Sequence, residues 1–394
     1  MVSAAGLSQR VARLSPSATL SISALAKAMR AEGLDVCILS AGEPDFDTPE
    51  HIRAAAIRAL EEGKTRYGPT AGIPTLRQAV ADKLRRENGL DYSPDQILIS
   101  NGGKQTLFNL AMVLLDPGDE VILPVPYWVS YPEMVALAGA KVVRVETQEG
   151  QGFKLTADQL RQALTPRSKL LILNSPANPT GAVYHRQELA ALAEVILSVP
   201  HLYVVCDEIY EKLVYGQARH ISLGSLCPDL MPRLILSSGF AKAYAMTGWR
   251  IGYLAGPKPI IEAAISLQSH STSNVCTFAQ YGALEALTSP LSAAAVEKMR
   301  QEFWQRRDLM VQGIRTLPGV TFPEPEGAFY VFVNIGQTGL GSVEFCQRLL
   351  KEHHVAAVPG VAFGAESYIR LSYAADRATL EKGLERLHRF LSSL

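Results

Sequence analysis

One lysine stands in an otherwise uncharged segment and could act as a nucleophile. Lys242 is the only charged residue among the thirteen from Leu234 to Met246, which are mostly small, apolar or aromatic. Poor hydration lowers the pKa of a lysine, and the neutral amine can then attack a carbonyl to form a Schiff base. The alternative is a structural lysine that carries its amine from the core to the surface.

A carboxylate at the end of an apolar run requires a partner. Asp207 follows the run LYVVC at residues 202–206. Burying an unpaired charge there would be costly. A cationic ring nitrogen would meet this requirement, and a structural arginine would meet it as well.

Two segments could bind an anion such as a phosphate. The segment SNGGK, residues 100–104, lies between an expected strand and an expected helix. Its glycines let backbone N–H groups approach an anion, and a helix N-terminus favours negative charge. Arg250 could hold a phosphate through two N–H groups. Taken by itself, SNGGK is also compatible with a plain strand-to-helix turn and a solvated Lys104.

Two further residues could contact a substrate. Asn178 precedes a proline in SPANPTG, residues 175–181, and is pushed toward extended conformations that can project its amide into a pocket. The same residue pairs also form ordinary turns. Arg370 lies in SYIRLSY, residues 367–373, where it is either a surface residue or a carboxylate clamp. The local pattern favours the surface.

Several known catalytic signatures are absent from the sequence. It contains no G-x-x-x-x-G-K-[ST], because Leu98 stands where the first glycine would be, and no G-x-S-x-G or H-E-x-x-H. Its eight histidines show no metal-ligand spacing. We therefore expect no metal site and no nucleotide-phosphate or serine-hydrolase chemistry.

The elements that must position these residues alternate between strand and helix from about residue 50. Seven short apolar runs are expected strands: 96–100, 119–124, 141–146, 169–174, 202–208, 233–238 and 250–256. Helical stretches lie between most of them. This pattern predicts an α/β fold with a mostly parallel, seven-stranded sheet covered on both faces. Ligands bind such sheets at the carboxyl ends of the strands, where these loops lie.

The two ends of the chain have a different pattern. Residues 1–20 are expected to form an irregular arm, followed by an amphipathic helix at 21–33. A long helix at 293–317 precedes the run AFYVFVN and then a helix, a strand and a helix. We predict a small α+β domain built from both ends, with residues 1–50 and 291–394, and a large domain at 51–290.

Composition narrows the class of protein. The chain has 394 residues, with 38 Lys+Arg against 38 Asp+Glu, so its formal charge gives no sign of nucleic acid or acidic membranes as partners. Its five cysteines are widely scattered in the sequence, which is typical of reduced thiols and not of a disulfide framework. No apolar run is long enough to span a membrane. The first residues do not have the pattern of a secretory signal, but a transit peptide is an alternative interpretation of them. We expect a cytoplasmic protein.

Taken together, the motifs resemble those of the class I aminotransferases, which use pyridoxal phosphate and share the aspartate aminotransferase fold (fold type I). The motifs are N-P-T-G, D-E-x-Y, S-x-x-x-x-K-x-x-x-M-T-G-W-R-x-G and a late R-L-S. The segments AGEPDFDTP, YGPTAGIPTLR, SNGGKQ and PYWVSYPEM resemble subgroup I-beta, the bacterial-type aspartate and aspartate/prephenate aminotransferases. The resemblance runs from about Pro16 to the C-terminus.

The resemblance implies roles around the cofactor ring. Lys242 would bind pyridoxal phosphate covalently and later act as general acid/base. Asp207 would keep the pyridine nitrogen protonated. Tyr210 and Asn178 would hydrogen-bond the phenolic oxygen, and Trp128 would stack on the ring and border the substrate.

It also implies a phosphate site shared between two subunits of a homodimer. Arg250 and the amides around Gly103 and Lys104 would bind the phosphate, together with Tyr67 from the other subunit. Other members often have a serine three residues before the lysine, but this chain has Gly239. Ser238, or its neighbour Ser237, would have to compensate.

For the substrate, the resemblance implies two carboxylate sites. Arg370 would bind the α-carboxylate, with Asn178 and the backbone at Gly42. The animal-type enzymes read the second carboxylate with an arginine, but residues 266–280 contain none. As in subgroup I-beta, Lys104 and Thr19 would bind it instead.

The expected activity is amino-group transfer between aspartate and 2-oxoglutarate. Prephenate/glutamate or aromatic transamination is the alternative within the same fold. Relatives active on prephenate tend to have a lysine where this chain has Ser15, which weakens the prephenate alternative. A ligand-sensing regulator with an aminotransferase-like domain would need an added DNA-binding module, for which we expect no room.

Overall fold

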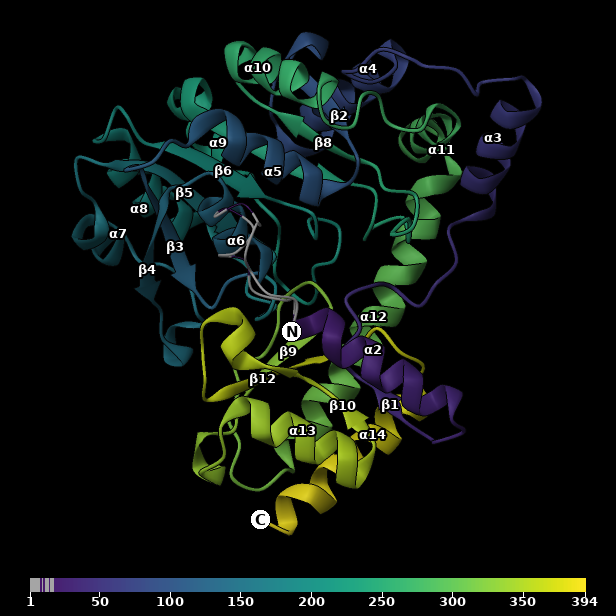
Figure 1. The fold of residues 1–394 in the computed structure, drawn as a ribbon, viewed down its shortest axis with the longest axis vertical. Helices are drawn as coiled ribbons and strands as arrows, with labels where there is room; N and C mark the ends of the chain where they lie inside the picture. Colours follow the sequence, from purple (N-terminus) through teal and green to yellow (C-terminus); the bar gives the residue numbers. More distant parts are fainter. Residues whose placement is uncertain (1–7, 9, 11–13, 15–17) are drawn as a thin grey trace.

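The computed structural model describes residues 8, 10, 14 and 18–394, without the side chains at 18–21 and 23. Its largest element is a seven-stranded sheet in the order β2-β8-β7-β6-β5-β3-β4, which confirms the predicted α/β fold (Figure 1). The strands are β2 (Ile97–Ser100), β3 (Glu120–Val125), β4 (Lys141–Glu146), β5 (Ser168–Asn174), β6 (Tyr203–Asp207), β7 (Leu234–Gly239) and β8 (Gly252–Ala255).

The central strands are buried on both faces, as their continuous apolar runs predict. On one face, apolar side chains of α5, α6 and α10 share a core cluster with β3 and β5. On the other face, α7, α8 and α9 share a cluster with β5 and β6. These helices are α5 (Gly103–Leu114), α6 (Ser130–Leu137), α7 (Ala157–Ala163), α8 (Arg186–Leu197), α9 (Leu223–Leu226) and α10 (Lys258–Ser269).

The structure differs from the sequence prediction in the direction of one strand and in the segment that precedes the sheet. Strand β8 is antiparallel to both β7 and β2. The segment between β7 and β8 forms turns rather than a crossover helix, and a parallel return would need such a crossover. In addition, residues 50–96 contain no strand: α3 (Glu50–Glu61) and α4 (Pro74–Lys83) come first, and α4 runs into a π-helical turn, Leu84–Asn88.

The lower part of the molecule in Figure 1 joins both ends of the chain. It contains a three-stranded antiparallel sheet, β11-β12-β9, and a parallel pair, β1-β10. The bounds are β1 (Cys37–Ile38), β9 (Tyr330–Asn334), β10 (Val355–Ala356), β11 (Val358–Pro359), β12 (Tyr368–Ser372), α2 (Ala18–Ala31), α13 (Ser342–His353) and α14 (Arg377–Ser392).

One core cluster unites these distant segments. Leu39 from the N-terminal segment packs with Phe345 of α13, Phe390 of α14 and the buried strand β9. Helix α2 packs on the same part through Ala26. The N-terminal segment and the C-terminal region therefore share a core, as the sequence analysis expects.

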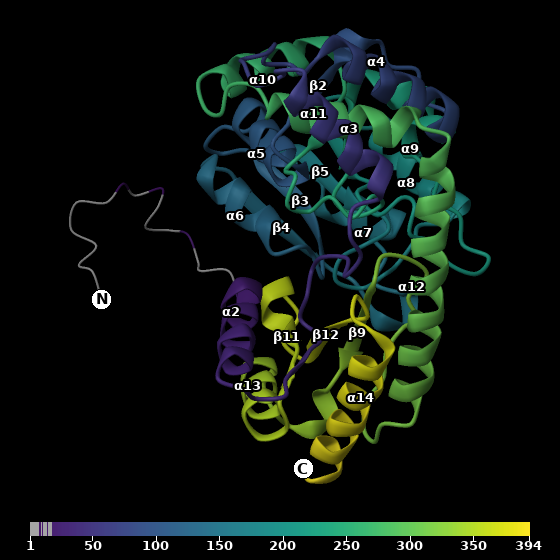
Figure 2. The ribbon, with the colours of Figure 1, turned by 90° about the vertical axis from the view of Figure 1, so that its right-hand side faces the viewer.

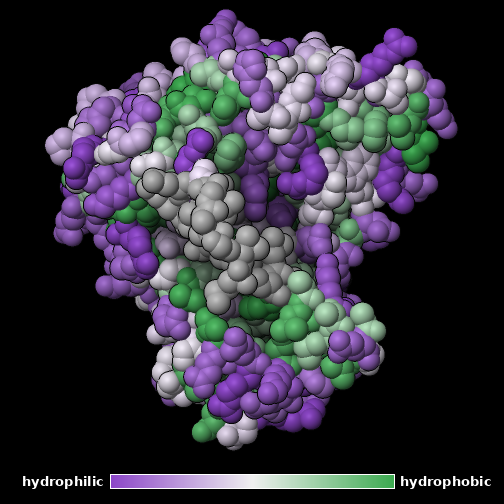
Figure 3. Space-filling model, in the orientation of Figure 1, coloured by the Kyte–Doolittle hydropathy of each residue, from purple (hydrophilic) through white to green (hydrophobic). Residues whose placement is uncertain are grey.

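The two parts are joined by α12 (Leu291–Arg315), which runs from the upper part to the lower one after α11 (Thr277–Thr288) (Figure 2). Figure 3 shows a hollow between the parts with hydrophilic side chains inside it. The predicted domain limits at residues 50 and 290 stay predictions. In the described part of the chain, no helix combines the length and apolarity needed to cross a membrane.

Candidate active site

Lys242 lies in the turns that follow β7 and is half-buried. Its Nζ donates a hydrogen bond to the carbonyl of Gly42 and lies 5.7 Å from the ring centroid of Tyr210 and 5.6 Å from that of Phe329. Burial lowers the pKa of Lys242 to about 8, and the positive charge of Arg370 adds to this effect. A neutral, nucleophilic amine is therefore accessible near neutral pH.

Asp207 ends β6 and is 6% exposed. Its carboxylate accepts hydrogen bonds from the Tyr131 hydroxyl at 2.7 Å and the Ile209 amide at 3.3 Å. Burial raises the pKa of Asp207 to about 6 despite these two bonds. Among the described residues no Lys, Arg or His forms an ion pair with it, so the alternative of a structural arginine partner is wrong for this part of the chain.

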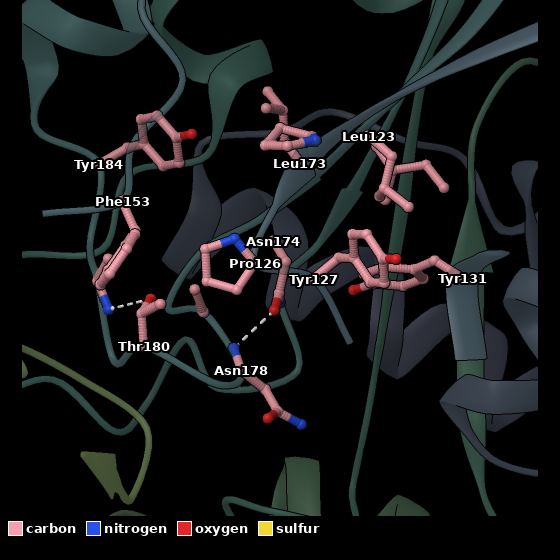
Figure 4. Close-up of a pocket in the computed structure, with 14 residues that line it drawn as sticks. Leu123, Pro126, Tyr127, Tyr131, Phe153, Leu173, Asn174, Asn178, Thr180 and Tyr184 are labelled. Atoms are coloured by element: carbon pink, nitrogen blue, oxygen red, sulfur yellow. Dashed lines mark hydrogen bonds between the residues drawn. The ribbon is translucent and has the colours of Figure 1, made fainter. Parts of the chain in front are cut away.

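Asn178 and Tyr210 follow β5 and β6 and face the same site. The Asn178 backbone amide donates to the Asn174 side chain at 2.8 Å, which fixes the loop (Figure 4). Its side-chain oxygen accepts from Arg370 at 2.9 Å. The Tyr210 hydroxyl lies 2.8 Å from that of Tyr330.

Arg370 is buried, and the surface position that its local pattern favours is wrong. Its side chain is 3% exposed. Strand β12 is the middle strand of the small sheet, with β11 along one edge and β9 along the other. Its guanidinium donates to Asn178 and to the Ser40 carbonyl at 3.0 Å. Its Nε is buried without a partner, and no carboxylate pairs with it in the described chain. An unpaired buried guanidinium is suited to a ligand carboxylate.

The residues predicted to bind an anion lie together, because the Arg250 guanidinium is next to Gly102 and Asn101 at the start of α5. The first amides of a helix have no intrahelical acceptor, so those of Gly103 and Lys104 can bind an anion. Arg250 donates to the carbonyls of Thr247 at 2.8 Å and Asn101 at 3.4 Å, which holds its guanidinium beside this helix end.

Close backbone contacts explain the glycines around that anion site. A Cβ on Gly252 would lie 2.5 Å from the Gly103 nitrogen, and one on Gly239 would lie 2.8 Å from the Gly252 Cα. A serine at position 239 would therefore not fit without a backbone shift. The neighbouring hydroxyls have other partners: Ser237 bonds Thr106 at 2.7 Å, and Ser238 donates to the Glu208 carbonyl at 3.4 Å.

Lys104 and Trp128 lie next to each other, with the Lys104 Nζ 5.1 Å from the indole centroid. Desolvation by neighbouring groups, and then the charge of Arg250, lower the pKa of Lys104, although its side chain is exposed. Trp128 contacts the Tyr131 ring edge-to-face at 5.3 Å. Tyr67 is 92% exposed and lacks a hydrogen bond to these residues. Thr19 falls in α2, but its side chain lies outside the described part.

A separate small pocket lies beside the candidate site. Figure 4 shows its lining, which includes Tyr131 and Asn178 as well as the apolar Phe153 and Leu123. Neither Lys242 nor Arg370 lines it. The lysine and the arginine of the candidate site therefore lie outside this pocket.

A second buried charged cluster lies behind the end of β6, and we call it the Glu208 cluster. Its members are Lys83, Asn88, Glu208, Glu211, His220 and Ser222. Burial opposes the charge of Glu211, but Lys83 outweighs it and lowers the pKa of Glu211 to about 2. Glu208, Glu211 and His220 have metal-ligand spacing, but the Lys83 ammonium already supplies a cation there.

Three site residues have no assigned role in the sequence analysis. Tyr131 holds Asp207, the Ser40 carbonyl holds Arg370, and Tyr330 contacts both Tyr210 and Arg370. Tyr131 belongs to the motif PYWVSYPEM, which gave a signal for it. Nothing in the local sequence marks Ser40 or Tyr330.

Comparisons with known proteins agree with this geometry. Residues 35–387 match the aminotransferase class I and II family. The chain is 50% identical over 392 residues to an aspartate aminotransferase of Geobacillus stearothermophilus, covering 98% of this chain and 99% of that protein. It is also 50% identical over 388 residues to an aspartate/prephenate aminotransferase of Thermus thermophilus, covering 98% and 99%.

A solved structure shows the same fold. The aspartate aminotransferase of Thermus thermophilus with maleate superimposes with a TM-score of 0.94 at 50% identity, covering 98% of this chain and 100% of that one. Sequence, fold and the arrangement of charged residues thus lead to one conclusion. The chain belongs to the class I and II aminotransferase family.

Proposed function

We propose that this protein is an aspartate:2-oxoglutarate aminotransferase that uses pyridoxal phosphate and works by two alternating half-reactions. The observation that carries the proposal is the position of the Lys242 amine, 5.7 Å from the Tyr210 ring centroid. The Tyr210 hydroxyl contacts that of Tyr330 at 2.8 Å, and the Tyr330 ring centroid lies 4.3 Å from the guanidinium carbon of Arg370. A nucleophile, a carboxylate without a cation and a guanidinium without a carboxylate therefore share one site.

The residues present fit the cofactor at both ends. The buried Asp207 carboxylate has no cationic partner among the described residues and suits a protonated pyridine nitrogen. The first amides of α5 and the Arg250 guanidinium suit a phosphate. When bound, pyridoxal phosphate supplies a carbonyl for the lysine and a ring that withdraws electrons.

The chain's own groups would then perform the transfer. Lys242 would hold the cofactor covalently and, once free, its amine would move a proton between the substrate Cα and the C4′ carbon of the cofactor. Arg370 binds the α-carboxylate in two parallel hydrogen bonds, oriented by Asn178. Trp128 would border the cofactor ring, and Tyr210 would donate a hydrogen bond to its phenolic oxygen.

The substrate's second carboxylate would bind near Lys104. This lysine lies beside Trp128 at the edge of the site, and relatives with 50% identity are named aspartate or aspartate/prephenate aminotransferases. Both names imply a substrate or product with two carboxylates.

We also propose a cytoplasmic homodimer with shared active sites. The 92% exposed Tyr67 side chain would reach the phosphate of the other subunit, and five free cysteines suit a reducing compartment. Sedimentation equilibrium of the purified protein tests the dimer, since a monomer mass would contradict a shared site.

A substrate panel tests the activity. The purified holoenzyme is assayed with aspartate, glutamate, phenylalanine and prephenate, each paired with a suitable partner. We expect the highest kcat/KM with aspartate and 2-oxoglutarate. A preference for prephenate or phenylalanine would reassign the substrate within the family, and absence of transfer from any amino acid would refute the proposal.

A further inference from the structure

Tyr330 contacts two residues that have roles in the proposed function. It is fully buried, and its ring centroid lies 4.3 Å from the guanidinium carbon of Arg370. Its hydroxyl lies 2.8 Å from the hydroxyl of Tyr210. One side chain therefore touches both the carboxylate clamp and a group that faces the cofactor ring.

Strand register explains why Tyr330 lies against Arg370. In the antiparallel pair β9–β12, Tyr330 is opposite Ser372 and Phe332 is opposite Arg370. Tyr330 and Arg370 are thus diagonal neighbours on the same face of the sheet. Long side chains at such positions are within reach of each other.

The guanidinium of Arg370 lies close to two aromatic rings, those of Tyr330 and Phe363. Phe363, which ends the turn Gly360–Phe363, has its ring centroid 5.1 Å from the guanidinium carbon. No carboxylate pairs with Arg370 among the described residues, and its Nε has no partner. The faces of the rings therefore add negative potential to that of the Asn178 and Ser40 oxygens, and ring contacts of this kind restrict the orientation of the guanidinium.

The hydroxyl of Tyr330 acts on Tyr210. A hydroxyl whose oxygen accepts a hydrogen bond becomes a stronger donor itself. Tyr330 can donate to the Tyr210 oxygen while the Tyr210 proton is directed to the site. A Cβ on Gly42 would lie 3.7 Å from the Tyr330 hydroxyl, so the loop that accepts the Lys242 hydrogen bond passes close by.

We propose that Tyr330 is a positioning residue that serves two groups: its ring orients Arg370 for the substrate carboxylate, and its hydroxyl strengthens the hydrogen bond from Tyr210 to the cofactor. This inference rests on the proposed function. It predicts that the two effects can be separated, because the ring and the hydroxyl are different parts of one side chain.

The test compares the holoenzymes of Tyr330→Phe and Tyr330→Leu with the wild type. Tyr373→Phe is the matched control, because Tyr373 is also fully buried and its hydroxyl bonds to backbone carbonyls at 3.3–3.5 Å. Three quantities are measured: the Kd for maleate, the pH midpoint of the visible absorption of the bound cofactor, and Tm.

Tyr330→Phe keeps the ring, so we expect a maleate Kd within about twofold of the wild type. Its absorption midpoint should rise by about half a pH unit, because Tyr210 becomes a weaker donor. Tyr330→Leu should show the same rise and, in addition, a roughly tenfold weaker maleate Kd. Tyr373→Phe should change neither quantity.

Two results would overturn the inference. One is a Tm loss in Tyr330→Leu with unchanged maleate affinity and midpoint, which would indicate a purely structural role. The other is an equal change in all three variants. Failure of the proposed function itself would look different, since the wild-type protein would then show no cofactor absorption band or no transfer.

Discussion

Two buried charged regions lie on opposite sides of the end of β6 and differ in how their charges are satisfied. In the Glu208 cluster, Lys83 pairs with Glu211 and His220 pairs with Glu208. In the active site, Asp207 and Arg370 form no ion pair with described residues. Asp207 and Glu208 are adjacent at one strand end, yet Glu208 has a cationic partner within the chain and Asp207 has none among the described residues.

The difference indicates where ligands bind. A buried charge without a partner is costly, so a fold that retains several of them in one place depends on ligands to supply the countercharges. The charged groups of the Glu208 cluster pair with one another inside the chain, which indicates a structural role. Substitutions in the two regions should accordingly affect different measurements.

The largest effect should come from Lys242→Ala. We expect a loss of transamination of roughly 10⁴-fold or more and loss of the absorption band of the covalently bound cofactor, with little change in Tm of the cofactor-free protein. Lys169→Ala is the control, since Lys169 stacks on Tyr203 away from the site. Retention of the band or of near-normal turnover would refute the assigned role.

Lys83→Met should have the converse effect. Removing one partner of a buried ion pair costs about 3–5 kcal/mol of unfolding free energy, while the KM for aspartate should stay unchanged. Denaturant unfolding measures the first quantity and steady-state kinetics the second. Lys258→Met, which breaks the exposed pair with Asp95, should leave stability nearly unchanged. An equal loss in both variants would remove the distinction between the regions.

Lys104→Ala should have a smaller, selective effect. Loss of a charged hydrogen bond predicts a kcat/KM about 10–100-fold lower for aspartate and glutamate. Alanine and phenylalanine, which lack the second carboxylate, should lose much less. If all four substrates lost activity equally, Lys104 would belong only to the phosphate end.

The smallest effect concerns pH and His220. Burial lowers the pKa of His220, but Glu208 outweighs it and the net shift is upward. Its stabilising contribution is therefore complete below the unfolded pKa of about 6.5 and is lost as pH rises through the folded pKa. The Tm difference between wild type and His220→Gln should be larger at about pH 6 than at about pH 9. A difference that grows with pH would contradict this sign.

Much of the large sheet was predictable because each of its strands is a short apolar run that can be recognised in the sequence by itself. The run KVVRVE has the bounds of β4, and the other strands end within two residues of their predicted limits at both ends. The antiparallel direction of β8 was not predictable in this way. It depends on the turns around Lys242, whose geometry no local apolar pattern encodes.

The candidate site was predictable only through combined motifs. Arg370 illustrates why, since its burial follows from the central place of β12 between β9 and β11. Tyr330 shows the same limit, because its contact with Arg370 is set by cross-strand register. Such relations become visible only when distant segments pair.

The crowded glycines at the phosphate end bear on how this protein can diversify. A side chain at Gly102 would be strained because φ is +88° there, and it would displace the Arg250 guanidinium, 2.6 Å away; Gly252 and Gly239 are confined by backbone atoms. Side chains can hardly be added at these glycines without moving the backbone that is expected to bind the phosphate. Lys104, by contrast, is exposed, so a change of amino-acid preference can accumulate there step by step. Engineering of a new substrate specificity should therefore keep these glycines and begin with substitutions at Lys104.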